Sequence, residues 1–223
     1  MSYKQEFVEF MVRANVLTFG DFVTKSGRQT PYFVNTGNYK TGAQIAKLGE
    51  IYAECIKNQV GQNFDLLYGP AYKGIPLAVT TAVALYQRYQ WDVPYCFNRK
   101  EQKDHGEGGG LIGWKPRDGE RVLIIEDVIT AGTSVRESLA LLKSVAQVNV
   151  GDLVVAVDRR ERGTNGRQTA LQELETALGI QTHPIVTIDE IVAFLHNREI
   201  DGRIIIDDSI KMKIEEYLQA YGV

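Results

Sequence analysis

The chain has 223 residues, 44% of them hydrophobic, which is enough for one large α/β domain with a sizeable core. Its formal net charge of −3 excludes a general attraction to nucleic acid or an anionic membrane, so any anion site must be built locally. Cys55 and Cys96 form no C-x-x-C motif, which argues against a zinc site or a disulfide framework and favours a reducing cytoplasm.

Helices are predicted where apolar residues recur with a period near 3.6 residues. The first is amphipathic, which distinguishes it from a signal peptide. The predicted helices are Tyr3–Val16, Gly42–Asn58, Gly74–Tyr89, Thr133–Gln147, Gln168–Leu178, Asp189–His196 and Ser209–Ala220. The apolar faces of the first and last helices could serve either the core or an interface. No apolar run reaches about 18 residues, so no transmembrane helix is expected.

Short apolar runs predict buried strands. They are Phe64–Tyr68, Val93–Phe97, Arg121–Ile125, Leu153–Val157 and Pro184–Ile188. Because strands and helices alternate from Phe64 onward, we expect an α/β fold with a central, mostly parallel sheet flanked by helices on both faces. Gly20–Gly37 is rich in turn residues and aromatics, which favours irregular structure or short antiparallel strands. We therefore expect a single domain over 1–223, with a small N-terminal hood at about 1–37 and a lid loop at about 99–113.

The most informative stretch is Val122–Ser134. Its apolar run ends in Glu126 and Asp127, and the small, hydroxyl-rich turn Thr130–Ser134 precedes a predicted helix. Such a turn can bind phosphate through backbone N–H groups and hydroxyls. The two acids lie too far before the helix to be simple N-caps. At the carboxyl end of a strand they can bind sugar hydroxyls or a hydrated Mg²⁺, so the stretch predicts a site for a phosphorylated sugar.

A second turn, Gly69–Pro76, follows the predicted strand Phe64–Tyr68 directly. Taken alone it reads as a plain strand-to-helix turn with a solvent-facing Lys73. Together with the first loop, Lys73 beside the N–H groups of the helix beginning at Gly74 predicts a second anion site, suited to a pyrophosphate.

The segment from Arg99 to Gly110 combines glycines with potential cations at positions 99, 100, 103 and 105. Most such segments are solvated charged loops, but this one could also be a mobile lid that brings cations to a leaving pyrophosphate. Gly108–Gly113 matches G-x-G-x-x-G, yet Trp114 and Pro116 follow instead of a helix, so a dinucleotide site is not predicted.

The aromatic segment Pro31–Gly37 and the later segment Asp158–Gly163 form the last candidate pair. Phe33 could be ordinary hood packing, and Arg159 could form a surface ion pair. The functional interpretation is a flat pocket for an anionic heterocycle, in which Phe33 stacks on the ring and Arg159 binds a carboxylate or ring carbonyl.

The layout of Val122–Ser134 resembles the phosphoribosyl pyrophosphate (PRPP) motif of the type I phosphoribosyltransferases. The lid sequence, the GPAYKGIP turn, the KSGR and PYF segments and the DRRERG segment are similar to those of the orotate phosphoribosyltransferases, over about residues 15–165. The resemblance implies Mg²⁺-dependent transfer of 5-phosphoribosyl from PRPP to orotate, giving orotidine 5′-monophosphate and pyrophosphate in pyrimidine biosynthesis. It also implies a homodimer whose lid residues reach the neighbouring subunit's site.

The same resemblance assigns roles to residues. Glu126, Asp127 and Lys103 are the implied catalytic residues, with the acids on the ribose hydroxyls and Lys103 on the departing diphosphate. The implied PRPP-binding residues are Lys25, Tyr72, Lys73, Arg99, Lys100, Lys103, His105, Glu126, Asp127, Val128, Ile129, Thr130, Ala131, Gly132, Thr133 and Ser134. The implied orotate-binding residues are Phe33, Val34, Thr130 and Arg159. Mg²⁺ is expected to be held mainly through PRPP and water, with no direct protein ligand.

Val34 departs from the family pattern, which often has a second aromatic there, and this puts a stacking contact at position 34 in doubt. Two alternatives stay open. One is a phosphoribosyltransferase for another base, although a purine enzyme would have no need of an arginine placed for a carboxylate. The other is a non-catalytic PRPP-sensing regulator on the same fold.

Overall fold

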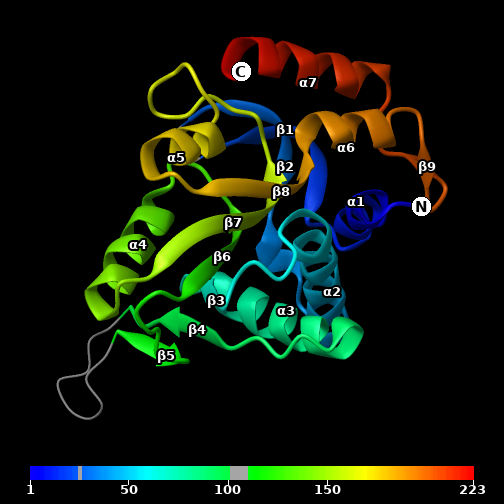
Figure 1. Ribbon diagram of the computed structural model, residues 1–223. Coiled ribbons are helices and arrows are strands. Elements are labelled where there is room, and N and C mark those ends of the chain that lie inside the picture. The colour runs from blue at the N-terminus through cyan, green and yellow to red at the C-terminus, as the bar shows by residue number, and fades with distance from the viewer. Residues whose placement is uncertain (25–26, 101–109) are drawn as a thin grey trace.

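The computed structural model describes residues 1–24, 27–100 and 110–223, and Lys25, Lys103 and His105 lie outside these ranges. Its centre is a six-stranded sheet in the order β5-β4-β3-β6-β7-β8 (Figure 1). The strands are β3 (Leu66–Gly69), β4 (Tyr95–Asn98), β5 (Leu111–Gly113), β6 (Arg121–Val128), β7 (Asn149–Asp158) and β8 (Gln181–Thr187). All neighbours are parallel except β5, which runs antiparallel to β4. The predicted α/β fold with a mostly parallel sheet is confirmed.

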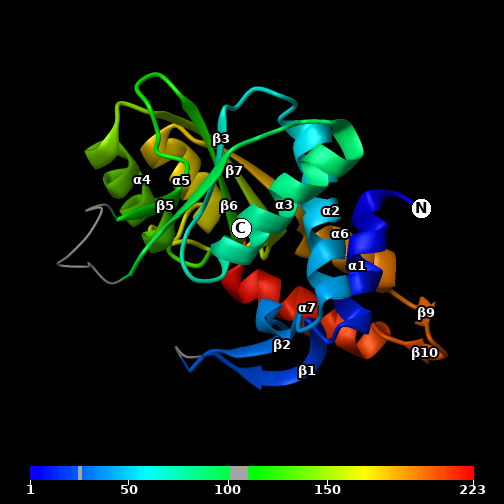
Figure 2. The same cartoon turned by 90° about the horizontal axis from the view of Figure 1, so that it is seen from below.

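Helices cover both faces of this sheet (Figure 2). One face carries α1 (Tyr3–Arg13), α2 (Gly42–Gln59), α3 (Gly74–Tyr89) and α6 (Ile188–Leu195), and the other carries α4 (Thr133–Val145) and α5 (Ala170–Leu178). The first helix ends three residues before the predicted Val16, because Asn15 is left-handed at φ 52°. None of the helices in the described ranges is long and apolar enough to cross a membrane.

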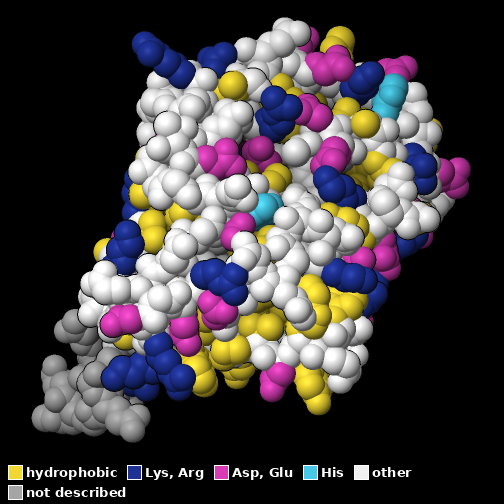
Figure 3. All heavy atoms as spheres, in the orientation of Figure 1, with side chains coloured by type: hydrophobic (Ala, Val, Ile, Leu, Met, Phe, Trp, Pro, Cys, Tyr) yellow, Lys and Arg dark blue, Asp and Glu magenta, His cyan; other side chains and the backbone are white. Residues whose placement is uncertain are grey.

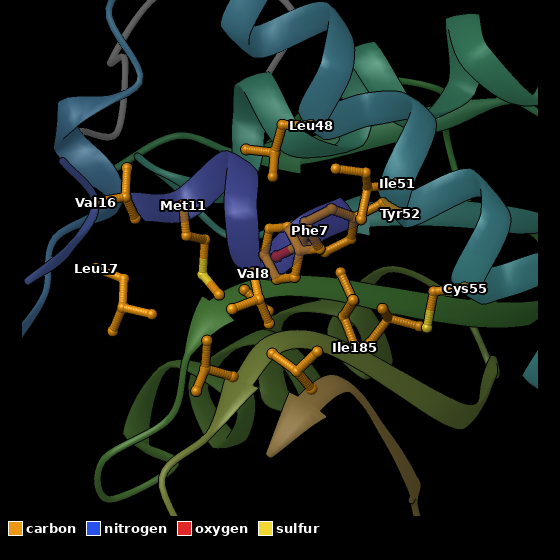
Figure 4. Packing of buried hydrophobic residues seen from close by; sticks show 14 of the residues in the cluster. Phe7, Val8, Met11, Val16, Leu17, Leu48, Ile51, Tyr52, Cys55 and Ile185 are labelled. Atoms are coloured by element: carbon orange, nitrogen blue, oxygen red, sulfur yellow. The ribbon is translucent and has the colours of Figure 1, made fainter. Parts of the chain in front are cut away.

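Within the predicted hood, β1 (Leu17–Val23) and β2 (Gln29–Val34) pair as antiparallel strands. Of the two predicted possibilities, irregular structure or short antiparallel strands, the structure shows strands. Helix α7 (Asp208–Tyr221) packs against β2 (Figure 2). Helix α1 is instead part of the core, where Phe7 and Met11 are fully buried near Leu48 and Tyr52 (Figure 4). A 3-10 turn, Thr36–Asn38, leads from β2 toward α2, and a small hairpin, β9 (Glu199–Ile200) with β10 (Arg203–Ile204), precedes α7.

The direction of winding reverses between β3 and β6, the two central strands. The chain leaves β3 for α3 on one face of the sheet and leaves β6 for α4 on the other. Tyr68 pairs with Ile124, so the turn after β3 lies beside the acid pair of β6. Open α/β sheets bind ligands in the crevice at such a point, outside the carboxyl ends of the strands.

Candidate active site

Glu126 and Asp127 lie near the end of β6, just before its last residue, Val128, and each is only 6% exposed. The predicted strand ended at Ile125, but β6 continues to Val128 because these residues still pair with β7. Asp127 Oδ2 accepts hydrogen bonds from Lys73 Nζ at 2.8 Å and from Thr36 Oγ1 at 2.6 Å. Asp127 is therefore held by two hydrogen bonds, one of them from Lys73, whose side chain remains 56% exposed.

The pKa of Glu126 is raised to about 7, mainly by burial and partly by the neighbouring Asp127 carboxylate, while Ser134 and Lys73 partly oppose the shift. The main-chain oxygen of Glu126 accepts a hydrogen bond from the Tyr52 hydroxyl at 2.7 Å. Because its pKa is about 7, the Glu126 carboxyl group titrates near neutral pH in the ligand-free protein. A cation that binds beside it would favour the ionised form.

The turn from Thr130 to Ser134 ends at the N-terminus of α4, where Gly132 is the N-cap residue at φ +69°. A Cβ on Gly132 would lie 2.6 Å from the Leu174 side chain, so both the backbone conformation and the packing require glycine here. The turn borders a cavity of about 570 Å³ that contains both hydroxyl and cationic side chains. Its lining residues are Tyr68, Pro70, Ala71, Asn98, Arg99, Lys100, Thr133, Ser134, Glu137, Ser138 and Leu141.

The turn after β3 is closed by a contact between Gly69 and Gly74, since a Cβ on Gly69 would lie 2.1 Å from the Gly74 oxygen. The Ala71–Tyr72 peptide bond in this turn is cis, and the Ala71 N–H donates to Asn98 Oδ1 at 2.7 Å. Tyr72 is exposed, with Lys100 Nζ 5.0 Å from its ring centroid. Asn98 was missed by sequence reasoning, although a polar residue just after the predicted strand Val93–Phe97 is a usable signal.

The base of the predicted lid is a hairpin. Strand β5 lies within the range predicted as loop, because a three-residue strand containing Gly113 carries almost no periodic signal. Its pairing with β4 brings Arg99 and Gly110 together, with the Arg99 N–H donating to the Gly110 oxygen at 2.8 Å. The two ends of the glycine-rich segment therefore meet beside Lys100.

A second cavity, of about 590 Å³, lies on the hood side of the acid pair. It is lined by Thr24, Arg28, Phe33, Lys73, Ile129, Thr130, Val157, Asp158, Arg159, Arg160, Glu161, Arg162, Ala170 and Leu171. Three of the four residues implied for orotate line it, whereas Val34 packs against the hydrophobic core. Phe33 is 40% exposed, so its ring is available to a ligand.

Arg159 does not form the exposed surface ion pair that was the simpler interpretation of the sequence. Its Nη2 lies 2.5 Å from Glu161 Oε1, with both side chains largely shielded from solvent. Burial opposes the charge, but Tyr32 and Glu161 more than offset it, so the pKa of Arg159 stays above its usual value. The Nε atom is buried without a hydrogen-bond partner among the described residues. Glu161 itself was not singled out from the sequence.

Comparisons with known proteins identify the family of this chain. The family model of the phosphoribosyl transferase domain matches residues 35–183. An orotate phosphoribosyltransferase of Clostridium beijerinckii is 56% identical over 221 residues, covering 99% of this chain and 98% of the relative. This chain belongs to the orotate phosphoribosyltransferases. The corresponding enzyme of Cronobacter sakazakii is 47% identical, covering 99% of both chains.

A crystal structure from this family has the same fold as this chain. The crystal structure of the orotate phosphoribosyltransferase of Francisella tularensis superposes with a TM-score of 0.84 at 34% identity, covering 98% of this chain and 100% of that one. The type I phosphoribosyltransferase resemblance drawn from Val122–Ser134 is thereby confirmed for the whole chain.

Proposed function

We propose that the protein transfers the 5-phosphoribosyl group of PRPP to N1 of orotate, giving orotidine 5′-monophosphate and pyrophosphate, as a step of pyrimidine biosynthesis in the cytoplasm. The observation that carries the proposal is the position of the Glu126–Asp127 pair. Lys73, which donates a hydrogen bond to Asp127, lines the cavity that contains Phe33 and Arg159. Ser134, in the turn that follows the pair, lines the cavity that contains hydroxyls and cations. Two buried free cysteines, Cys55 and Cys96, suit a reducing compartment.

Each part of the ligand has a suitable partner in this arrangement. The 5′-phosphate binds the turn Thr130–Ser134 at the start of α4, and the ribose hydroxyls bind the acid pair. The diphosphate binds Lys73, Arg99, Tyr72 and Lys100. The family resemblance assigns Lys25, Lys103 and His105, which lie outside the described residues, to PRPP binding as well. Orotate stacks on Phe33, and its carboxylate contacts Arg159, whose Nε has no other partner among the described residues. Val34 contributes at most a backbone contact.

The reaction requires positioning and electrostatic stabilisation more than proton transfer. The bond from C1 to the diphosphate oxygen breaks before the bond to N1 forms, so positive charge develops on the ribose ring. The Asp127 carboxylate, held by Lys73 and Thr36, keeps the ribose in place while this charge develops. Orotate N1 loses its proton readily, so no strong protein base is required. Lys103 stabilises the negative charge on the departing diphosphate.

The donor set fits Mg²⁺ as a cofactor. No group of three or more His, Cys, Asp or Glu side chains in the described ranges is arranged to hold a metal ion. Two hard carboxylates are present, and Mg²⁺ typically uses one or two carboxylates together with substrate phosphates and water. When bound, the ion neutralises diphosphate charge and orients the ribose. Glu126 and Asp127 would hold it mainly through PRPP and water.

An apolar surface near the lid supports the homodimer. Tyr86 and Val83 of α3 are about half exposed, and Tyr95 and Ile112 of β4 and β5 are exposed to 37% each. Hydrophobic side chains gather over α3 and β4 at the lower edge of Figure 3. Ile112 lines a hollow of about 300 Å³ with Tyr72, Arg99 and Lys100. A second copy docked on this surface would therefore lie beside the base of the lid.

The proposal is tested by incubating the protein with PRPP, Mg²⁺ and a panel of bases and following absorbance and pyrophosphate release. Orotate consumption is expected. Turnover of hypoxanthine or adenine but not orotate would reassign the base, and tight PRPP binding without pyrophosphate release would indicate a sensor.

The role of Lys103 is tested by Lys103→Ala, for which we expect kcat to fall by about 10²-fold or more. A change within about twofold, with PRPP binding also unaltered, would contradict this role. Mixing Lys103→Ala subunits with Asp127→Asn subunits tests whether sites are shared. Recovery of activity on mixing two individually weak variants is expected if lid residues act in the partner's site.

A further inference from the structure

Glu161 is a hub that joins three separate parts of the chain at the edge of the base cavity. Its Oε1 atom lies 2.5 Å from Arg159 Nη2 and accepts a hydrogen bond from the Tyr217 hydroxyl at 2.8 Å. The Tyr32 hydroxyl donates to the same oxygen at 3.3 Å, and Arg28 Nη1 lies 3.4 Å from Oε2. These partners come from the hood strand β2 and its preceding turn, from the segment after β7, and from α7.

Aromatic rings pack against the residues that contact Glu161. The rings of Tyr32 and Tyr217 meet edge to face at 5.9 Å between centroids, and the guanidinium of Arg28 lies 4.5 Å from the centroid of the Tyr221 ring. Tyr32 is fully buried and Tyr217 is 6% exposed. Glu161 therefore cannot move without disturbing well-packed aromatic side chains, which makes it a fixed support for Arg159.

The charges of the hub also match a specific ligand. Arg28, Arg159 and Glu161 together carry a net charge of +1, because two guanidinium groups surround one carboxylate. One uncompensated positive charge suits a monoanionic group such as the carboxylate of a base. Without Glu161, the guanidinium of Arg159 would keep its charge and its contact with the Tyr32 ring, 5.4 Å away at the centroid, but would lose the carboxylate that fixes its orientation.

We infer that Tyr217 and Glu161 are positioning residues for the base. Glu161, in the cavity wall, and Tyr217, outside the cavity, orient the Arg159 guanidinium toward the ligand carboxylate. This inference rests on the proposed function, because it takes orotate as the ligand of Arg159. It assigns to α7, which is far from the PRPP motif in sequence, a part in selecting the base that acts through Glu161 and Arg159.

The test is Tyr217→Phe, which keeps the ring packed against Tyr32 and removes only the hydroxyl. We expect the KM for orotate to rise about fivefold to tenfold, with kcat, the KM for PRPP and the Tm nearly unchanged, because a hydrogen bond to a charged group is lost. Tyr221→Phe is the matched control. It removes a hydroxyl from the same helix that donates no hydrogen bond to Glu161, and its orotate KM should equal that of the wild type.

A second variant separates positioning from charge compensation. Glu161→Gln makes the hub more positive, so if Glu161 acted only as a counter-charge the variant would bind orotate more tightly. Positioning predicts weaker orotate binding instead. Tighter binding by Glu161→Gln, an orotate KM unchanged in Tyr217→Phe, or parallel loss of Tm and of both KM values in Tyr217→Phe would each overturn the inference. A wild type that does not consume orotate would refute the proposed function itself.

Discussion

Glu126 should make the stability of the ligand-free protein depend on pH. The change to test is Glu126→Gln, which replaces the buried carboxyl group with a neutral side chain of the same shape. Burial raises the pKa of Glu126 from 4.5 to about 7 in the folded protein. The unfolded chain therefore releases this proton at a lower pH than the folded chain does.

The magnitude follows from this difference. Between about pH 4.5 and pH 7 the folded state binds the proton and the unfolded state does not, so the free energy of unfolding falls as pH rises. Each tenfold difference in proton affinity corresponds to about 1.4 kcal/mol, which gives a loss of about 2.5 kcal/mol between pH 5 and pH 8. Glu126→Gln has no carboxyl group to titrate at this position, so its free energy of unfolding does not fall in this way. The variant should therefore gain stability relative to the wild type as pH rises.

The measurement is urea unfolding of both proteins at pH 5, 6.5 and 8, without ligands and at one protein concentration. Glu216→Gln, at an exposed position of α7, is the control and should differ from the wild type by a constant amount. If the difference between wild type and Glu126→Gln is the same at pH 5 and pH 8, the carboxyl group is not desolvated by its surroundings as the structure indicates.

Two further predictions concern the phosphate turn and the base cavity. Gly132→Ala places a Cβ at φ +69° and against Leu174, so it should destabilise the protein by about 1–3 kcal/mol and raise the KM for PRPP. Gly179→Ala is the control, because Gly179 has nearly the same positive φ but no atom near its would-be Cβ. If both variants lose the same stability and bind PRPP like the wild type, the contact with Leu174 is unimportant. Arg159→Lys keeps the charge but loses the planar fork, so the KM for orotate should rise about tenfold or more while that for PRPP stays constant. Arg167→Lys at an exposed position is the control, and equal orotate affinity in both variants would remove Arg159 from the base site.

The parts of the fold predicted most closely are those with strong local signals. The predicted helix Gly74–Tyr89 is confirmed at both ends, because Gly74 permits the contact with Gly69 and Gln90 turns left-handed at φ 60°. Strand β5 was missed because three residues are too few to show alternation.

The candidate site was predictable where its residues are consecutive, as in the turn Thr130–Ser134, and not where contacts join distant segments. Thr36 donates to Asp127 across 91 positions of sequence, and Tyr217 donates to Glu161 across 56. Neither pairing leaves a trace in spacing or periodicity, because each depends on the packing of whole elements against one another. The individual binding and catalytic roles stay predictions for the experiments above.

The bridging position of Glu161 has a reciprocal consequence. If the docking of α7 and the hood strengthens orotate binding through Arg159, then orotate must strengthen that docking by the same free energy. Amide hydrogens of α7 and β2 should then exchange more slowly in the presence of the base, although neither element belongs to the PRPP motif. Exchange at these two elements would thus show whether the base cavity is filled.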